Sequence, residues 1–210
     1  MNGFSYRHLI LGKNFPLISL SGAAILIMAS DRLAHALVVT GALAWVFCLS
    51  SLAVFAGVKF FPRKGRFALL AFLTSFISGI YFLLLWIISP FCALQTFFVF
   101  PFISMLCISS EIFRHFQKHN IKDTLRDSVS QALVHGALVV IFSLIREPIG
   151  FSSLSLPGGA QGIIMIFSSN GQLFLPFRLI ASSSGALLLL GYLIGLYRHL
   201  KNIYSPEKSR

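Results

Sequence analysis

Acidic residues are scarce in this sequence, which has six Asp and Glu residues against 17 Lys and Arg residues in a chain of 210. Only 11% of the residues are charged, whereas about a quarter are charged in a typical soluble domain. Apolar residues are abundant: 56% of the chain is hydrophobic, 22 residues are Phe, and the mean hydropathy is +0.83. The composition therefore predicts an all-α integral membrane protein with one domain, residues 1–210.

The motifs of many enzymes and nucleic-acid-binding proteins are also absent. The sequence contains no nucleophile elbow, no P-loop, no paired carboxylates for acid–base chemistry and no His-rich metal motif. The net charge of +11 comes from short cationic clusters between apolar runs, not from a basic stripe with interleaved aromatic residues. The three cysteines show no CxxC spacing, so no disulfide framework is expected. We expect a non-catalytic chain that contacts the lipid bilayer and no nucleic acid.

Six apolar runs predict six transmembrane helices. The first run is short for a hydrocarbon core of about 30 Å, and the fourth contains a proline, Pro101. The predicted spans are Phe15–Ser30, Ala34–Val58, Phe67–Ser89, Ala93–Phe113, Val129–Ile145 and Leu179–Tyr197.

The cations are distributed unevenly over the two membrane faces that six spans define. An even number of spans places both termini on one face, and all Lys and Arg residues except three belong to that face. The exceptions are Arg32, Arg146 and Arg178. By the positive-inside rule, the N- and C-termini are predicted to be cytoplasmic.

Two short matches predict an internal duplication. Phe15–Ser19 (FPLIS) matches Phe100–Ser104 (FPFIS), and Val39–Leu49 (VTGALAWVFCL) matches Val134–Leu144 (VHGALVVIFSL) in the same order. Each half (residues 15–90 and 92–198) then holds three spans, so the second half enters the membrane in the opposite sense. The sequence therefore predicts an inverted 3+3 repeat with broken first and fourth helices, a pattern that places sites near the membrane midplane.

The proline in the fourth run leads to the first candidate site. A thiol such as Cys107 at a helix break can bind a soft metal or an iron–sulfur cluster, and an ordinary buried cysteine is the simpler interpretation. The repeat places Gly22 opposite Cys107. Glu111 lies one turn further on the same helix face, where it is either a functional acid in the membrane or an interfacial ion-pair partner of Arg114.

Charged residues flank the fifth run. Asp127 and Arg146 stand at its two ends, about 28 Å apart in a helix, so they are not expected to pair with each other. The segment Arg146–Gly150 (REPIG) is interpreted as a helix end, at which Pro148 stops the helix and Gly150 provides a left-handed cap. The glycines that follow are interpreted as part of a loop.

The second half carries an ordered series of motifs. An acid opens the fifth run, an Arg-Glu-x-x-Gly motif closes it, an Asn-Gly with leucines and a proline precedes the last run, and a Cys-hydrophobic pair lies in the fourth. These residues are Asp127, Arg146, Glu147, Pro148, Ile149, Gly150, Asn170, Gly171, Leu173, Leu175, Pro176, Cys107 and Ile108. The series resembles the small six-span subunits of the Rnf and Nqr ion-translocating electron-transport complexes, particularly the E-type Rnf and D-type Nqr subunits.

The resemblance implies a fold, a cofactor and partners. Members of this family are inverted repeats with broken first and fourth spans. Two oppositely oriented paralogous subunits each contribute two cysteines to an intramembrane [2Fe–2S] cluster, which relays electrons across the membrane in a process coupled to Na⁺ or H⁺ movement. The resemblance thus implies a membrane subunit of such a complex in a bacterial inner membrane, with Cys107 as a metal ligand.

The sequence departs from the family pattern in its first half. The family's first cysteine is expected near Ser21–Ala24, where this chain has none, and Leu106 replaces the Asn before Cys107. A [2Fe–2S] cluster takes four ligands, normally thiolates with histidine as the known substitute, and this chain offers one. Either Ser21 is a ligand, or another chain completes the cluster, or the cluster has been lost. In the family reading Ser21, Gly22 and Ala24 line the position opposite Cys107.

Three functions stay open on this basis. The first is an electron-relaying or scaffolding subunit of an Rnf/Nqr-like complex, in which Asp127, Arg146 and Glu147 anchor helix ends or contact neighbouring subunits. The second is the substrate-binding membrane component of a small-molecule (vitamin-type) transporter, a class with similar length, span number and basic cytoplasmic face. The third is a structural paralogue without a cofactor. The motif series favours the first function, and the missing first-half cysteine favours the third.

Overall fold

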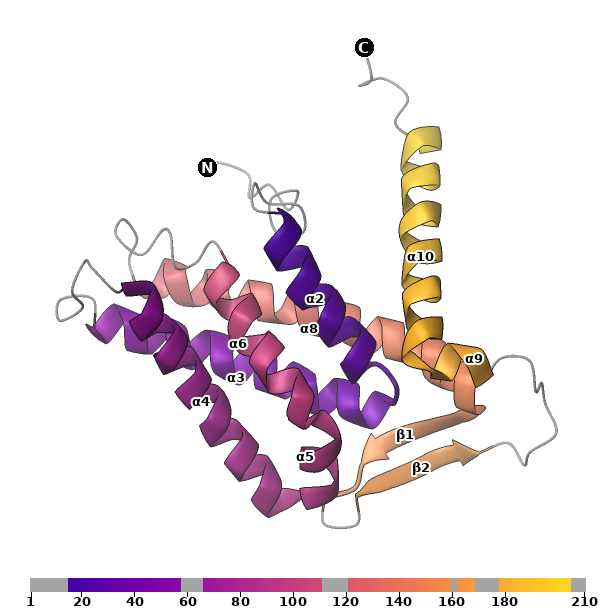
Figure 1. Ribbon diagram of the computed structural model, residues 1–210, viewed down its shortest axis with the longest axis horizontal. Coiled ribbons are helices and arrows are strands. Elements are labelled where there is room, and N and C mark those ends of the chain that lie inside the picture. The colour runs from indigo at the N-terminus through magenta and orange to yellow at the C-terminus, as the bar shows by residue number, and fades with distance from the viewer. Residues whose placement is uncertain (1–14, 58–65, 111–120, 160–161, 169–177, 205–210) are drawn as a thin grey trace.

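The computed structural model describes residues 15–57, 66–110, 121–159, 162–168 and 178–204. These residues form a helical bundle with a two-stranded β-hairpin beside it (Figure 1). In chain order the elements are α2 (Phe15–Ala29), α3 (Leu33–Gly57), α4 (Arg66–Ile88), α5 (Pro90–Thr96), the 3-10 helix η1 (Phe97–Val99), α6 (Phe100–Ser109), α8 (Ile121–Phe151), β1 (Ser153–Pro157), β2 (Ile163–Ser168), α9 (Arg178–Ala181) and α10 (Ser183–Tyr204).

Four of the described helical segments are long and apolar enough to cross a membrane, and they coincide with the second to fifth predicted spans. They are Leu33–Phe55, Ala68–Ile88, Pro90–Ser109 and Lys122–Phe151. The helices at the first and sixth predicted spans are shorter: α2 has 15 residues, and the apolar part of α10 is Ser183–Leu196. The prediction of a mostly helical chain with apolar helices that could span a membrane is confirmed, while the count of six spans and the inverted repeat stay predictions.

The centre of the bundle is an antiparallel pair formed by α3 and α8. The N–H of Leu33, at the start of α3, donates to Glu147 Oε2 near the end of α8 (2.6 Å). Near the middle of α8, a Cβ atom added to Gly136 would lie 2.5 Å from Cγ2 of Thr40 in α3. The glycine therefore permits the close approach of the two helices. The two segments that the second sequence match relates therefore lie against each other.

A second pair, α2 and α6, lies in front of the first in Figure 1. Both helices begin on the repeated Phe-Pro, with Pro16 and Pro101 as their second residues. Proline is tolerated there because the first N–H groups of a helix have no partner inside the helix. The 3-10 helix η1 separates α5 from α6 in the fourth span, whereas Cys107, which was predicted at the break, lies inside the regular helix α6. The corresponding position before Phe15 lies outside the described residues.

Helix α4 packs on α3 and α6 through aromatic side chains. The hydroxyl of Tyr81 donates to the carbonyl of Val38 in α3 (3.0 Å). The ring of Phe82 meets the rings of Phe97 and Phe100 edge to face at centroid distances of 5.4 and 5.5 Å. The outer side of α4 is a continuous row of exposed apolar side chains, as expected for a helix that faces lipid.

Helix α8 ends directly after REPIG, but the roles predicted for Pro148 and Gly150 at this end are wrong. Helix α8 continues through Pro148 to Phe151, and the residue with a positive φ is Ser152 (φ 50°). The N–H of Ser152 donates to the carbonyl of Pro148 (3.0 Å), which closes the last turn. Gly150 serves close packing instead, because a Cβ atom there would lie 3.1 Å from the backbone of Ala181.

A β-hairpin follows α8 where the sequence was interpreted as a loop. Strands β1 and β2 pair antiparallel, with an irregularity between Leu154 and Ser155. The chain reverses at Gly158–Gly162, where Gly159 and Gly162 have positive φ angles of 61° and 82° that favour glycine. The glycines after REPIG thus form the turn of this hairpin.

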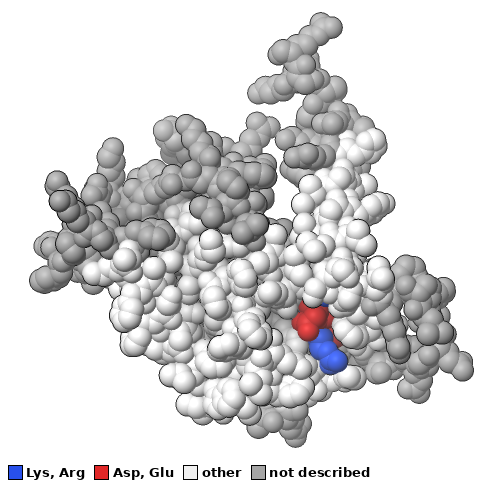
Figure 2. Space-filling model, in the orientation of Figure 1, with Lys and Arg blue, Asp and Glu red and all other residues white. Residues whose placement is uncertain are grey.

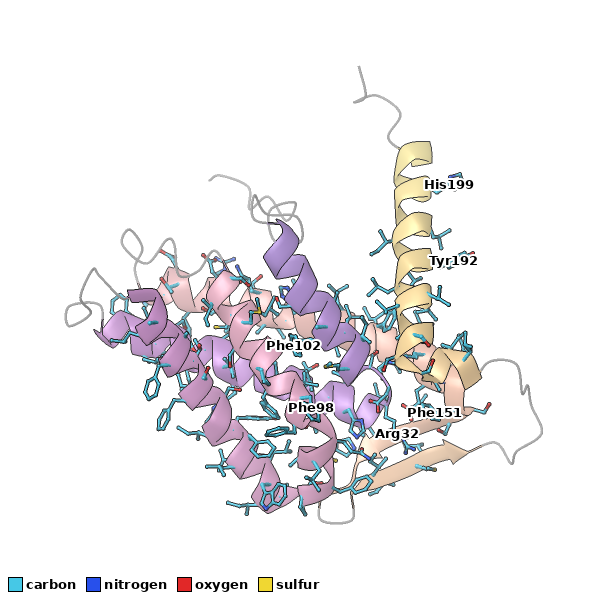
Figure 3. The ribbon with its side chains drawn as sticks, in the orientation of Figure 1. Arg32, Phe98, Phe102, Phe151, Tyr192 and His199 are labelled. Carbon is cyan, nitrogen blue, oxygen red and sulfur yellow. The ribbon has the colours of Figure 1, made fainter. Side chains whose placement is uncertain are left out.

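The last predicted span consists of two helices that meet at Ser182. The hydroxyl of Ser182 donates to the carbonyl of Leu179 (2.6 Å) and accepts the N–H of Gly185 (3.2 Å), which fixes the bend. A side chain at Gly185 would collide with the backbone of Leu179. Beyond the bend, α10 extends away from the bundle (Figure 1), and Tyr192 and His199 point outward from it (Figure 3).

Candidate functional site

Charged residues gather at one end of the α3–α8 pair, next to α9. On the face drawn in Figure 2, the described side chains are uncharged except for one small group at the base of α10. This end of the pair carries residues from the α2–α3 link, from the start of α3 and from the end of α8. We call the set Asp31, Arg32, His35, Arg146 and Glu147 the Arg146 cluster.

Arg146 is 1% exposed, and all three of its guanidinium nitrogens donate hydrogen bonds. The acceptors are the carbonyl of Ile180 for Nε (3.0 Å), the carbonyl of Ile27 (2.8 Å) and Oγ of Ser30 (2.9 Å) for Nη1, and the carbonyls of Ala181 (2.8 Å) and Ser182 (3.2 Å) for Nη2. Most of these carbonyls belong to the last turns of α2 and α9, where helix carbonyls lack internal partners. The cation therefore joins two helix ends to α8.

Glu147 follows Arg146 but faces a different element. Its side chain is fully buried, and Oε2 accepts the backbone N–H of Leu33 in the first turn of α3. A carboxylate is stabilised at a helix N-terminus by the free N–H groups and the helix dipole. Oε1 has no hydrogen-bond partner among the described residues. Glu147 thus caps α3 with one oxygen and leaves the other unpaired.

Asp31 and His35 form the part of the cluster nearest to the surface. Asp31 Oδ1 lies 2.7 Å from Nδ1 of His35 and also accepts the N–H of Arg32 (2.8 Å). The side chain of Asp31 is 38% exposed, whereas that of His35 is 3% exposed. Arg32 lies over the ring of Phe151, 5.4 Å from its centroid, so it also links the start of α3 to the end of α8 (Figure 3).

Together the contacts of the cluster connect α2, α3, α8 and α9 at one place. Sequence reasoning singled out Arg146 and Glu147 as anchors of helix ends, and both contact helix ends here. It missed Asp31 and His35. The signal available was an acid and a histidine four residues apart, in the one short link that breaks two apolar runs, DRLAH. Asp127, the other predicted anchor, lies partly buried on α8 away from this cluster.

Cys107 and Ser21, the predicted cluster ligands, lie on the neighbouring helices α6 and α2. Cys107 is 1% exposed and Ser21 is 0% exposed. Cys107 belongs to the apolar core with Ile103 and Leu106. Cys48 and Ser50 of α3 lie within electrostatic reach of its thiol, a proximity between helices that no spacing in the sequence indicates.

These residues do not fit a [2Fe–2S] cluster shared with a second subunit. A shared cluster needs its thiols at the surface where two subunits meet, and the interior of this chain encloses both Cys107 and Ser21. In the described part of the chain, no group of three or more His, Cys, Asp or Glu side chains could hold a metal ion. The thiol of Cys107 and the hydroxyl of Ser21 are therefore core groups in this arrangement.

The other predicted positions are placed only in part. His135 lies in the centre of α8, stacked on Phe47 of α3, and its Nδ1 is 2.8 Å from the carbonyl of Gln131. Gly22 has open space around its Cα. Glu111 with its suggested partner Arg114, and the motif residues from Asn170 to Pro176, lie outside the described residues.

No protein-family model matches this chain, and no curated protein matches it.

Proposed function

We propose that this chain is a membrane subunit of a redox-driven, ion-translocating complex of the Rnf/Nqr type. In this proposal it holds the electron-carrying subunits in position and provides no ligand to their cofactors. Its place would be a bacterial inner membrane, with six spans as an inverted 3+3 repeat and both termini in the cytoplasm. Its partners would be other membrane subunits, among them an oppositely oriented paralogue.

The observation that carries this proposal is the packing of the repeated segments on each other. Helices α2 and α6, which share the Phe-Pro start, lie side by side, and the matched parts of α3 and α8 meet where Thr40 approaches Gly136. An inverted repeat relates its halves by a two-fold axis in the membrane plane, so equivalent helices that lie next to this axis pack against each other. The arrangement supports the repeat, and with it the resemblance that the motif series suggests.

Burial of the predicted ligands supports a scaffolding role over a ligating one. Cys107 and Ser21 face the interior of the chain, and Gly22 takes the place that the repeat assigns to a second thiol. A subunit that keeps the fold but encloses its single thiol can still hold neighbouring redox subunits in position. The exposed apolar sides of α4 and α10 provide surface for such neighbours and for lipid.

The test is purification of the tagged full-length chain from its native membrane under anaerobic conditions, followed by protein identification, iron analysis and EPR. We expect flavin-binding and iron–sulfur subunits in the complex, and an EPR spectrum and iron content that Cys107→Ser leaves unchanged. Loss of a cluster signal in Cys107→Ser would assign ligation to Cys107. Recovery of an ATP-hydrolysing uptake module instead of redox subunits would contradict the redox proposal and indicate a transporter.

A further inference from the structure

The β-hairpin exposes apolar side chains on the side away from the helices. Strand β1 lies against α3 and α8, and Ser155 in its centre is 0% exposed (Figure 1). Leu156 and Ile164 stand opposite each other in the register, on the other face, and are 38% and 48% exposed. The next two residues of β2, Met165 and Ile166, are 54% and 60% exposed. We call these four apolar side chains the hairpin patch.

The turn of the hairpin is attached to the bundle at the start of α5. Sγ of Cys92 donates to the carbonyl of Gly162 (3.8 Å), and a Cβ atom at Gly162 would lie 3.3 Å from Cδ1 of Phe91. Phe91 is half exposed, and the last turn of α4 exposes further apolar side chains. These are Trp86, Ile87 and Ile88. The exposed apolar surface of α4 thus continues across Phe91 onto the hairpin.

The chain around the hairpin carries no charge. The sequence has no Asp, Glu, Lys, Arg or His from Pro148 to Phe177. The segments before α4 and α8, residues 58–65 and 111–120, each contain both Lys and Arg. A segment that faces water normally contains charged residues, which make up about a quarter of a typical soluble domain. The composition therefore indicates that the hairpin contacts something other than water.

Lipid fits the hairpin patch better than a second protein does. Protein interfaces are enriched in Tyr, Trp and Arg and have a polar rim, whereas this patch consists of Leu, Ile and Met without a charge nearby in the sequence. Exposed tryptophans of membrane proteins gather at the level of the headgroups. Trp86 lies in the last turn of α4, and α5, which holds the hairpin turn, begins at Pro90. The hairpin turn is thus close to that level.

The free edge of the hairpin limits how deep it can lie. The sheet has two strands, so one edge of β2 leaves a row of N–H and C=O groups without partners in the sheet. Open sheet edges do not occur in the hydrocarbon region, because no water is present there to satisfy such groups. The headgroup region contains water and adjoins the acyl chains. It can therefore accept both the polar edge and the apolar patch.

We propose that the hairpin patch is a lipid-binding surface that lies in the headgroup region of the bilayer, with Leu156 and Ile164 in contact with the upper part of the acyl chains. Amphipathic helices that lie on membranes bury their apolar face at the same boundary. The inference requires only that the bundle lies in a bilayer. It is independent of the redox proposal, because it uses no contact with another subunit.

The test places a nitroxide spin label on single cysteines of the full-length chain in phospholipid vesicles, with the native cysteines replaced by alanine. Ile164→Cys reports on the patch. Phe76→Cys, exposed near the middle of α4, is the lipid reference, and Asp123→Cys, exposed in the first turn of α8, is the water reference. EPR power saturation compares collisions with oxygen, which concentrates in lipid, and with nickel(II) ethylenediaminediacetate, which stays in water.

We expect the oxygen-to-nickel collision ratio at Ile164→Cys to be several-fold higher than at Asp123→Cys and clearly lower than at Phe76→Cys. Leu156→Cys, on the other strand, carries the same prediction if Ile164→Cys does not fold. Unfolding by increasing SDS at the same concentration as for the unlabelled chain shows that a labelled variant keeps its fold.

Four results would overturn the inference. A ratio at the patch equal to that of Asp123→Cys would place the hairpin in water. Few collisions with both reagents would mean that protein, either a partner or a second copy, covers the patch. A ratio equal to that of Phe76→Cys would place the hairpin in the hydrocarbon region. A low ratio at Phe76→Cys itself would show that α4 does not face lipid, and would thereby remove the membrane assignment together with the inference.

Discussion

The two ends of the α3–α8 pair are built differently, although one sequence match relates both helices. At one end α8 carries Arg146 and Glu147, whose side chains reach α2, α3 and α9. The match assigns Ser51 and Leu52 of α3 to the equivalent positions. The hydroxyl of Ser51 donates to the carbonyl of Cys48 in its own helix (2.8 Å), and Leu52 faces outward. Of these four matched positions, only Arg146 and Glu147 bring charged side chains to other elements.

This difference distinguishes the contacts that hold the two helices together from the charged contacts that occur at one end only of the matched positions. The pair itself rests on apolar packing and on the close approach at Gly136, near its middle. Burying charges costs several kcal/mol unless hydrogen bonds compensate, so the Arg146 cluster is not a generic way to join two helices. It fixes where the first helix ends and where the last one turns away from the bundle.

Arg146→Met should give the largest effect. The substitution keeps an unbranched apolar stem in place of the aliphatic part of arginine but leaves four carbonyls and the hydroxyl of Ser30 without a donor. We expect the free energy of unfolding to fall by about 3–5 kcal/mol, as when one partner of a buried charged network is removed. Unfolding of the purified chain in mixed micelles by increasing SDS measures it.

The matched control is Arg126→Met, because Arg126 is exposed near the opposite end of α8. A change within about 0.5 kcal/mol is expected for such a surface site. Equal losses for the two arginines would mean that the ends of the pair do not differ energetically, and would remove the basis of the comparison.

Gly136→Ala should have the next largest effect, at the middle of the pair. The new methyl group would meet Thr40 Cγ2 at 2.5 Å, so one of the helices must shift. We expect a loss of about 1–3 kcal/mol in the free energy of unfolding, as for other overpacked sites. The same SDS titration applies.

Gly22→Ala is the control for this substitution, since nothing lies within 4 Å of a Cβ atom at Gly22 in α2. There the higher helix propensity of alanine should stabilise the chain by up to about 1 kcal/mol. A loss of similar size at both glycines would contradict a specific close approach at Gly136.

Glu147→Gln should destabilise the chain less than Glu147→Ala does. The amide oxygen of glutamine can still accept the N–H of Leu33, whereas alanine leaves that buried donor unpaired. We expect a loss of about 1–3 kcal/mol for the alanine variant and less for the glutamine variant. Equal losses would indicate that the negative charge matters, and not the cap on α3.

Ser51→Ala should give the smallest effect, at the end where Ser51 and Leu52 take the positions that match Arg146 and Glu147. The serine hydroxyl satisfies only a carbonyl of its own helix, and alanine has the higher helix propensity. We expect a change of less than about 0.5 kcal/mol in the free energy of unfolding. A loss comparable to that of Arg146→Met would show that this end also holds neighbouring elements together.

The sequence predicted the positions of the helices well, because long apolar runs and the proline in Phe100-Pro101 determine the secondary structure of their own segments without distant contacts. It failed at Pro148, where a proline that usually stops a helix lies inside one. The contacts of Arg146 and Glu147 before Pro148, and the packing of Gly150 against Ala181 after it, keep the chain helical through the proline. Such tertiary contacts override local preference and leave no trace in the spacing of residues.

The candidate site was predicted in part for the same reason. Arg146 and Glu147 stand out because charges are rare in apolar runs. Their partners Ile27, Ser30 and Ala181 are ordinary residues whose backbone or hydroxyl happens to be near. The proximity of Cys48 to Cys107, and the burial of Cys107 itself, depend on how α3 packs on α6. No pattern within one helix reveals it.

The most direct test of the central claim, that the matched segments of α3 and α8 pack on each other, is a cross-link between Thr40→Cys and Gly136→Cys in a chain whose native cysteines are replaced by alanine. The Cβ of Thr40 lies 3.3 Å from the Cβ position at Gly136, close to the separation in a disulfide. Mild oxidation in native membranes should link the two residues within one chain, as shown by cleavage between the helices and electrophoresis without reductant. A chain that stays unlinked, or that links only to a second copy, would contradict the account.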